Sequence, residues 1–197
     1  MKTKITTCFP HYYLITADNF KKDKIFLDNL AICLENGISL VQLRSKSLSV
    51  LEYKNLANDA IKLCHKYNAK LILNNYVQMV EELNADGVHL TSSNLLSCKT
   101  RPLNENYIVS ASCHNKIELM HAQQIQLDFV TLSPVLKTMS HPDIPPLGWK
   151  QFQQLAKLVD LPIFALGGLK QKELECAIKY GAHGVSGISA FWGEQSI

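Results

Sequence analysis

The residues best suited to chemistry in this sequence are cations, amides, hydroxyls, histidines and glycines that follow short apolar runs. Each run has the composition of a β-strand, and in a barrel of parallel strands the residues that finish the strands meet at one end. We therefore treat them as one candidate set: Gln42, Arg44, Lys46, Asn74, Asn75, His89, Ser110, Ser112, His114, Ser133, Thr138, Gly167, Gly168, Ser186 and Ser189.

Arg44 and Lys46 offer fixed positive charge to an anion, and the guanidinium of Arg44 suits a bidentate grip on oxyanions. Side chains two residues apart share a strand face, so Gln42 and Arg44 are expected to point the same way, with Lys46 continuing that side. The alternative is a solvated strand end whose cations form surface ion pairs.

Two glycine-containing segments, ALGGL at 165–169 and GVSGISA at 184–190, end the last two expected strands. In barrels the loops after these strands often bind phosphate through backbone N–H groups, which glycine allows a ligand to approach closely. The placement favours a phosphate site there, and a tight turn is the alternative.

The histidines and cysteines of the strand ends divide by face. Ser110, Ser112 and His114 share a face, which leaves a catalytic role for His114 open, whereas Cys113 points away and is expected to be packing. His89, in the block GVHL, is more often a satisfied core or rim histidine than a catalytic one.

The elements that must position these residues alternate along the chain. Candidate strands cover 11–16, 39–44, 70–75, 87–90, 107–113, 128–135, 162–168 and 184–190, and helical spacing covers 25–36, 50–67, 116–125, 149–159 and 170–180. This order predicts a single (β/α)8 TIM-barrel domain over 1–197, with a doubly wound open sheet as the competitor. Residues 136–148 form the long irregular loop, and such loops are usually functional.

Composition limits the partners. The chain of 197 residues is 47% hydrophobic and carries a formal net charge of +3 without a block of like charges, which argues against nucleic acid and anionic membrane surfaces. No apolar run is long enough for a membrane span, and the N-terminus lacks signal-peptide features. The six cysteines form no C-x-x-C pair, so we expect a reduced, cytoplasmic protein. A homo-oligomer stays open.

Seven blocks in order resemble the thiamine phosphate synthase/TenI family: VQLRSK, LILNN, ADGVHL, VSASCH, LSPVLKTMSH, PIFALGGL and GAHGVSGISA. The wording is closest to the thiamine phosphate synthase-like domain fused behind Nudix hydrolases. The resemblance implies a (β/α)8 barrel that binds a thiazole phosphate and, in the synthase, joins it to a pyrimidine diphosphate with loss of pyrophosphate.

The resemblance also implies roles for individual residues. Gln42, Arg44 and Lys46 match a Q-x-R-x-K block that contacts the diphosphate and the pyrimidine. Asn74 and Ser112 match the family's strand-end Asn and the serine of S-x-H. Further positions match groups that hold the thiazole carboxylate and phosphate: Thr138, Ser140, Gly168 and Ser189.

The chain departs from the family pattern at three positions. Asn75 and Asn94 stand where the synthase has two magnesium-binding carboxylates, and His141 stands where it has a lysine. Magnesium prefers carboxylate and phosphate oxygen, so this change should weaken a Mg²⁺ site at Asn75 and Asn94. No organic cofactor is implied.

Three functions follow from these observations. The first is a synthase in which Asn75, Asn94 and the substrate's own phosphates still hold magnesium and Arg44 and Lys46 stabilise the leaving pyrophosphate. The second is a metal-independent, TenI-like thiazole tautomerase with His114 as general acid and base. The third is a non-catalytic thiazole-phosphate or thiamine-phosphate binding module that works with a Nudix hydrolase. Intact phosphate loops and the Q-x-R-x-K block favour the synthase.

Overall fold

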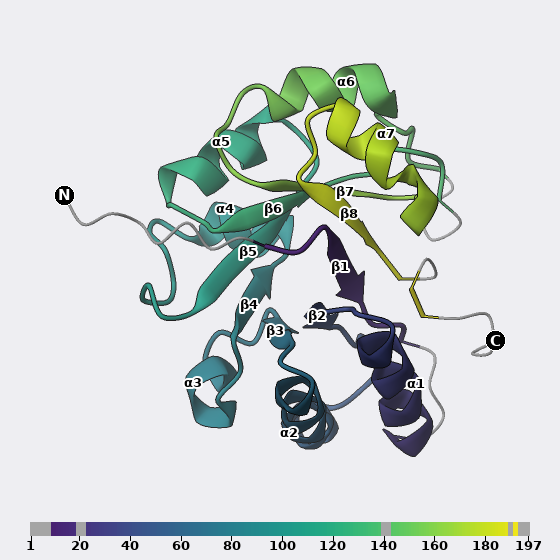
Figure 1. The fold of residues 1–197 in the computed structure, drawn as a ribbon. Coiled ribbons are helices and arrows are strands. Elements are labelled where there is room, and N and C mark those ends of the chain that lie inside the picture. Colours follow the sequence, from purple (N-terminus) through teal and green to yellow (C-terminus); the bar gives the residue numbers. More distant parts are fainter. Residues whose placement is uncertain (1–8, 19–22, 139–142, 189–190, 193–197) are drawn as a thin grey trace.

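The protein is a closed barrel of eight parallel strands surrounded by helices (Figure 1). The computed structural model describes residues 9–18, 23–138, 143–188 and 191–192. The strands are β1 Tyr12–Ile15, β2 Leu40–Leu43, β3 Lys70–Asn74, β4 Gly87–Leu90, β5 Ile108–Cys113, β6 Phe129–Leu132, β7 Ile163–Leu166 and β8 Gly184–Gly187. Each strand pairs in parallel with its sequence neighbour, and β8 closes the barrel onto β1.

The helices lie outside the strands and connect them (Figure 1). They are α1 Asp23–Glu35, α2 Val50–Lys66, α3 Met79–Leu83, α4 Ser92–Ser97, α5 Lys116–Gln124, α6 Gly148–Ala156, the 3-10 helix η1 Gln171–Glu173 and α7 Leu174–Lys179. The predicted (β/α)8 fold is confirmed and the open sheet is excluded. That all of 1–197 forms one domain stays a prediction, since the barrel strands run from Tyr12 to Gly187.

Two features of the fold differ from the sequence expectation. Helices α3 and α4 were not predicted, because five or six residues are too few to show a helical period. Several strands end earlier than predicted, since the chain leaves the ladder where φ becomes positive, at 65° for Asn75 and 104° for Gly167. Strand-end residues such as Asn75 and Ser133 still donate their N–H across the sheet, to the carbonyl oxygens of His89 and Cys113.

Two hydrophobic clusters hold the barrel together, one on each face of the strands. The larger cluster packs helices against the outer face of the sheet. The smaller one fills the interior with Phe9, Tyr13, Leu40, Ile72, Phe129 and Phe164. Their rings meet edge to face, as for Phe129 and Phe164 with centroids 5.2 Å apart, and burying each such side chain stabilises the fold by about 2 to 3 kcal/mol. The interior is therefore a packed core at this level.

The start of α2 is fixed by its own sequence. Ser49 caps the helix by accepting a hydrogen bond from the Glu52 N–H, while the Glu52 carboxylate accepts from the Ser49 N–H at 2.9 Å. This reciprocal capping box is worth about 1 kcal/mol and sets where the loop after β2 must end.

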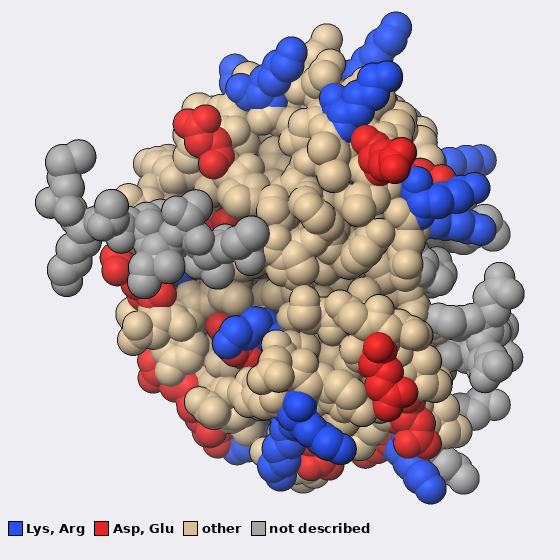
Figure 2. Space-filling view, in the orientation of Figure 1, with Lys and Arg blue, Asp and Glu red and all other residues tan. Residues whose placement is uncertain are grey.

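On the face drawn in Figure 2, Lys and Arg side chains and Asp and Glu side chains both occur, with other residues between them. No continuous basic area covers that face, in keeping with the small net charge of +3. Within the described ranges, no helix is long and apolar enough to cross a membrane.

Candidate functional site

Because all strands are parallel, their carboxyl ends form one mouth of the barrel, which we call the carboxyl mouth. Active sites of this fold lie at that mouth. The predicted residues Arg44, Asn75, His114, Ser133 and Gly167 each follow the last residue of a strand directly or at the next position. The fold therefore brings these predicted strand-end residues to the same mouth.

A buried layer of polar side chains lies inside the barrel. The Gln42 side-chain amide donates to the Tyr13 hydroxyl at 2.8 Å, and the Asn74 amide donates to Gln42 Oε1 at 3.0 Å. Burial raises the pKa of Tyr13, so its hydroxyl stays protonated. Gln42 thus sits inside the barrel as part of a neutral hydrogen-bonded chain that joins β1, β2 and β3.

His89 extends this layer across β4 and β5. Its Nδ1 lies 2.9 Å from Ser110 Oγ and its Nε2 lies 2.9 Å from Ser112 Oγ. Complete burial lowers the pKa of His89 from its ordinary 6.5 to about 3, so the ring is neutral at physiological pH. The structure therefore places His89 in the interior, as a satisfied histidine that holds Ser112.

Thr131 is an exception within this layer. Strand alternation puts it on the interior face with Phe129, and the strand register puts it opposite Ser112. Its hydroxyl is fully buried yet has no hydrogen-bond partner among the described residues. Leaving a buried hydroxyl unsatisfied costs about 1 to 3 kcal/mol, so the interior is not fully satisfied at this position.

The loop after β2 carries the two predicted cations. Arg44 is half-buried and Lys46 is exposed. Neither forms an ion pair with a carboxylate of the described part of the chain. The alternative of cations neutralised by surface ion pairs is thus not seen among the described residues, although the charge of Arg44 acts on the nearby Asp18 carboxylate.

Asn75 and Asn94, the expected remnants of a metal site, do lie together. Asn75 Oδ1 accepts the Thr91 N–H at 2.9 Å and the Asn94 side-chain N–H at 3.0 Å. The Asn75 oxygen is therefore already occupied by donors, and the pair carries no negative charge. Within the described residues, no group of three His, Cys, Asp or Glu could hold a metal ion. This donor set does not fit a resident Mg²⁺.

His114 is exposed at the end of β5 and does not hydrogen-bond to Ser112 as a pair would. Its Nδ1 lies 2.9 Å from the Ser133 carbonyl oxygen, which can only accept, so Nδ1 carries a proton in this contact. The His114 backbone N–H donates to the buried Glu118 carboxylate at 2.5 Å. Cys113 lies in the outer core, where burial raises the pKa of its thiol, in agreement with a packing role.

The glycines after β7 are required by a close backbone approach. A Cβ on Gly167 would lie 2.8 Å from Pro134 Cα, and one on Gly168 would lie 2.5 Å from the Lys137 carbonyl oxygen. The Leu136 N–H donates to Gly167 O at 3.0 Å, which ties the loop after β6 to the end of β7. This packing accounts for the two glycines as a tight turn, and phosphate binding there stays a prediction.

The other residues predicted to bind phosphate lie in the barrel wall, in the loop after β6 or outside the described residues. Ser186 is buried, and its hydroxyl donates a hydrogen bond to Tyr13 O at 2.9 Å. This bond joins the neighbouring strands β8 and β1. Thr138 is half-buried in the loop after β6. Ser140, His141 and Ser189 lie outside the described residues.

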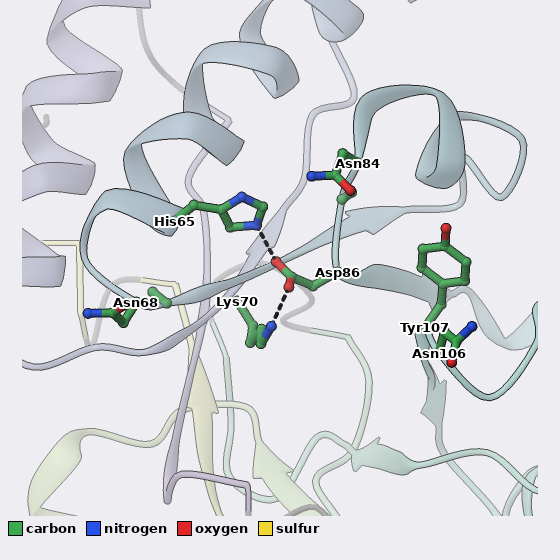
Figure 3. Close-up of a pocket in the computed structure, with 9 residues that line it drawn as sticks. His65, Asn68, Lys70, Asn84, Asp86, Asn106 and Tyr107 are labelled. Atoms are coloured by element: carbon green, nitrogen blue, oxygen red, sulfur yellow. Dashed lines mark hydrogen bonds and ion pairs between the residues drawn. The ribbon is translucent and has the colours of Figure 1, made fainter.

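A polar cavity of about 470 Å³ lies at the opposite end, the amino mouth (Figure 3). The Asp86 carboxylate at its centre accepts from the Leu71 N–H at 2.9 Å and contacts His65 Nε2 at 2.9 Å and Lys70 Nζ at 2.7 Å. Its lining is His65, Asn68, Ala69, Lys70, Asn84, Ala85, Asp86, Asn106 and Tyr107. Because these charges neutralise one another and this end of the fold usually serves stability, we do not take it as the active site.

A comparison with protein families identifies the family of the chain. The model of the family described as thiamine monophosphate synthase, TMP-TENI, matches residues 12–191. The chain belongs to this family.

Individual relatives agree with this family assignment. The "Putative thiamine-phosphate synthase 2" of Aquifex aeolicus (strain VF5) is 37% identical over 182 residues, covering 92% of this chain and 97% of the relative. The "Thiamine-phosphate synthase" of Methanobrevibacter smithii is 31% identical over 179 residues, covering 90% of this chain and 85% of the relative. The solved "Thiamine phosphate pyrophosphorylase from Pyrococcus furiosus" has the same fold, with a TM-score of 0.76, 22% identity, and coverage of 94% of this chain and 88% of that chain.

For this member of the thiamine monophosphate synthase family, sequence reasoning missed residues that the barrel closure brings into the site. Tyr13 joins Gln42 to His89, and Thr131 faces the same interior. Both residues stand inside apolar runs and therefore read as core residues. Their hydroxyl groups are the one sign in the sequence that they carry polar atoms into the barrel. Asp18, two residues after Thr16, was also overlooked, although it follows a strand end.

Proposed function

We propose that this chain is a thiamine phosphate synthase that joins a pyrimidine diphosphate to thiazole phosphate and releases pyrophosphate. The observation that carries the proposal is a pair of cations, Arg44 and Lys46, without carboxylate partners in the described chain, at the mouth of a barrel whose interior is polar and neutral. Membership of the thiamine monophosphate synthase family supports it.

The proposed reaction needs electrostatic stabilisation rather than a protein nucleophile. The bond between the pyrimidine methylene carbon and the diphosphate oxygen breaks, and the oxygen keeps the electron pair. The thiazole nitrogen then uses its lone pair to form the new C–N bond. Negative charge therefore grows on the departing pyrophosphate, where Arg44 and Lys46 stabilise it. Removing one such donor commonly costs about a hundredfold or more in rate.

The neutral layer supplies the complementary part of the site. Gln42, Asn74 and the Ser112–His89 pair offer donors and acceptors without charge, which suits an uncharged heteroaromatic ring. Because His89 does not ionise at neutral pH, it does not repel the developing pyrimidine cation. Binding of thiazole phosphate by Thr138, Ser140, His141, Gly168 and Ser189 is part of the same proposal.

The expected magnesium ligands, Asn75 and Asn94, are amides rather than carboxylates. Asn75 Oδ1 already accepts the Asn94 side-chain N–H, so the proposal assigns no step to a metal held by these residues. The cations of the loop after β2 carry the charge stabilisation instead.

A second candidate, the metal-independent thiazole tautomerase, is favoured by this same amide pair. His114 would act as the general acid and base through Nε2, because its Nδ1–H is engaged by the Ser133 carbonyl. Incubation of the purified chain with the thiazole carboxylate phosphate in D₂O would test it. Deuterium incorporation that is lost in His114→Gln supports the tautomerase, and no incorporation excludes it.

The resemblance to domains fused with Nudix hydrolases leaves a third candidate, a binding module that works beside such an enzyme. It differs from the first two in requiring no turnover by the chain alone.

A single assay tests the synthase against the other two functions. The purified chain is incubated with thiazole phosphate and pyrimidine diphosphate, with and without magnesium, and thiamine phosphate is measured by chromatography. Formation of thiamine phosphate in proportion to the chain's concentration supports the synthase. Absence of product at high protein concentration would end that proposal.

A further inference from the structure

A single carboxylate organises the loop that carries the two cations. Asp18 Oδ1 accepts the Ser45 hydroxyl at 2.8 Å and the Ser47 hydroxyl at 3.2 Å. The Lys46 backbone N–H donates to both carboxylate oxygens, at 3.0 Å to Oδ1 and 2.9 Å to Oδ2. Asp18 therefore contacts three consecutive residues of the loop after β2.

The rest of the loop is held by secondary contacts around the same point. Ser45 Oγ accepts the N–H of Ser47 at 3.3 Å and of Leu48 at 3.2 Å. The hydroxyl that Asp18 binds therefore also fixes the backbone of the next residues of the loop. On the other side, the Thr16 hydroxyl accepts the Arg44 N–H at 3.0 Å and donates to Arg44 O at 3.2 Å. The end of β1 thus fixes the backbone of both Arg44 and Lys46.

The contacts of Asp18 go to hydroxyls and a backbone N–H, not to the cationic side chains. Burial raises the pKa of Asp18, but hydrogen bonds from Ser45, Lys46 and Ser47 and the charge of Arg44 outweigh it and lower the pKa. Asp18 is therefore ionised at neutral pH. A negative charge near an anion site weakens the local positive potential, so charge alone would make Asp18 unfavourable there.

We propose that Asp18 is a positioning residue that holds the Arg44–Ser47 loop in the conformation that binds the diphosphate group. This inference rests on the proposed function. A loop ordered before binding loses less conformational entropy when the anion arrives, which offsets the unfavourable charge. Asp18 acts through the loop backbone and does not contact the substrate.

Titration with inorganic pyrophosphate tests the inference without turnover. Calorimetry at low ionic strength would compare the wild-type chain with Asp18→Ala, Asp18→Asn and the control Asp23→Asn, which removes an equal charge from an exposed residue at the start of α1. Asp18→Ala should weaken pyrophosphate binding about tenfold, because the charge-assisted hydrogen bonds that hold the loop are lost. Asp18→Asn keeps one acceptor oxygen and should recover part of the affinity, whereas Asp23→Asn should not change it.

Kinetics provide a second readout. In the synthase assay, Asp18→Ala should raise the KM for the pyrimidine diphosphate about tenfold and leave the KM for thiazole phosphate unchanged. A general loss of structure would affect both substrates, so the difference between the two KM values separates positioning from unfolding. Ser45→Ala removes one of the bonds to Asp18 and should give a smaller change in the same direction.

The outcomes distinguish this inference from the proposed function. If the wild-type chain forms no thiamine phosphate, the synthase proposal fails, and the pyrophosphate titration still judges Asp18. Unchanged or tighter pyrophosphate binding by a folded Asp18→Ala, or no binding by the wild-type chain, would overturn the positioning role. Should Asp18→Ala fail to fold, Asp18→Asn and Ser45→Ala decide by the same criterion.

Discussion

The two mouths of the barrel each contain a carboxylate next to basic residues, but the carboxylates are used differently. At the amino mouth, Asp86 binds the side chains of His65 and Lys70 directly (Figure 3). At the carboxyl mouth, Asp18 binds hydroxyls and a backbone N–H, and neither Arg44 nor Lys46 forms an ion pair with a described residue. At one mouth the carboxylate is ion-paired with the basic side chains, whereas at the other the carboxylate forms no ion pair with the two cations of the loop.

This difference separates stability from function. A carboxylate that neutralises neighbouring cations ties the ends of strands together and leaves little for a ligand. Asp128 acts similarly, accepting the Val109 N–H at 2.7 Å and pairing with Arg101 at 2.5 Å. A carboxylate that accepts only from hydroxyls and a backbone N–H, as Asp18 does, fixes a loop without forming an ion pair with its cations. We therefore expect substitutions at the carboxyl mouth to change activity and those at the amino mouth to change stability.

The largest expected effect is the loss of activity when Arg44, at the carboxyl mouth, is replaced. Arg44→Ala should lower kcat/KM for thiamine phosphate formation about a hundredfold, equivalent to about 3 kcal/mol, because pyrophosphate loses its bidentate partner. The matched control is Lys70→Ala at the amino mouth, which should leave kcat/KM unchanged. Equal losses in the two variants would contradict the division between the mouths.

At the amino mouth, a substitution is expected to lower stability and leave activity unchanged. Asp86→Ala should lower the free energy of unfolding by about 2 kcal/mol, because the Leu71 N–H and two basic side chains lose their acceptor. Urea denaturation measures this, with the exposed Asp59→Ala as control, where a change within about 0.5 kcal/mol is expected. The activity per folded molecule of Asp86→Ala should equal that of the wild type; a large loss would place Asp86 in the functional site.

The neutral interior below the carboxyl mouth predicts a pH dependence of stability. The folded-state pKa of His89 is about 3, below its ordinary 6.5, so the unfolded chain binds a proton that the folded chain does not. Stability from this residue is complete above about pH 6.5 and falls by about 1.4 kcal/mol per pH unit as the pH decreases toward 3.

Denaturation curves between about pH 7 and pH 5 would measure this slope, since most carboxylates remain ionised there. His89→Gln should flatten it. An unchanged slope in His89→Gln would show that the interior imidazole is not the group responsible.

The smallest expected effect concerns the amide pair beside the carboxyl mouth. Asn75→Asp combined with Asn94→Asp restores two negative charges and should raise any magnesium-dependent rate about tenfold. The synthase assay across a magnesium series measures this, with the metal-free rate as the internal control. No response to magnesium in the double variant would mean that these two residues do not form the metal position.

The elements and the candidate residues were largely predictable from the sequence, for a local reason. Each strand and most helices can be recognised from neighbours within a few residues, as the β-rich run SLVQLR and the helical spacing of Leu56, Ala60 and Cys64 show. The family blocks added identity, and the family-model match confirmed it. The five- and six-residue helices α3 and α4 were not predictable, because they are shorter than the periods needed to detect them.

Pairing within the site was less predictable. His89 reads from the sequence as an isolated histidine, yet it bonds Ser112, 23 residues away, and contacts Tyr13, 76 residues away. Ser112 and His114, which share a strand face, instead bond to different partners. Proximity across the barrel, rather than along a strand, decided these contacts.

The sequence by itself determined the order of the strands and of the longer helices, the polar residues at the strand ends and the membership of the family. Only the tertiary structure decided which polar groups satisfy one another, as in the Asn75–Asn94 pair, and which charges remain available, as at Arg44. The physical reason is that secondary structure depends on nearby residues, whereas neutralisation and burial depend on groups that closing the barrel brings together.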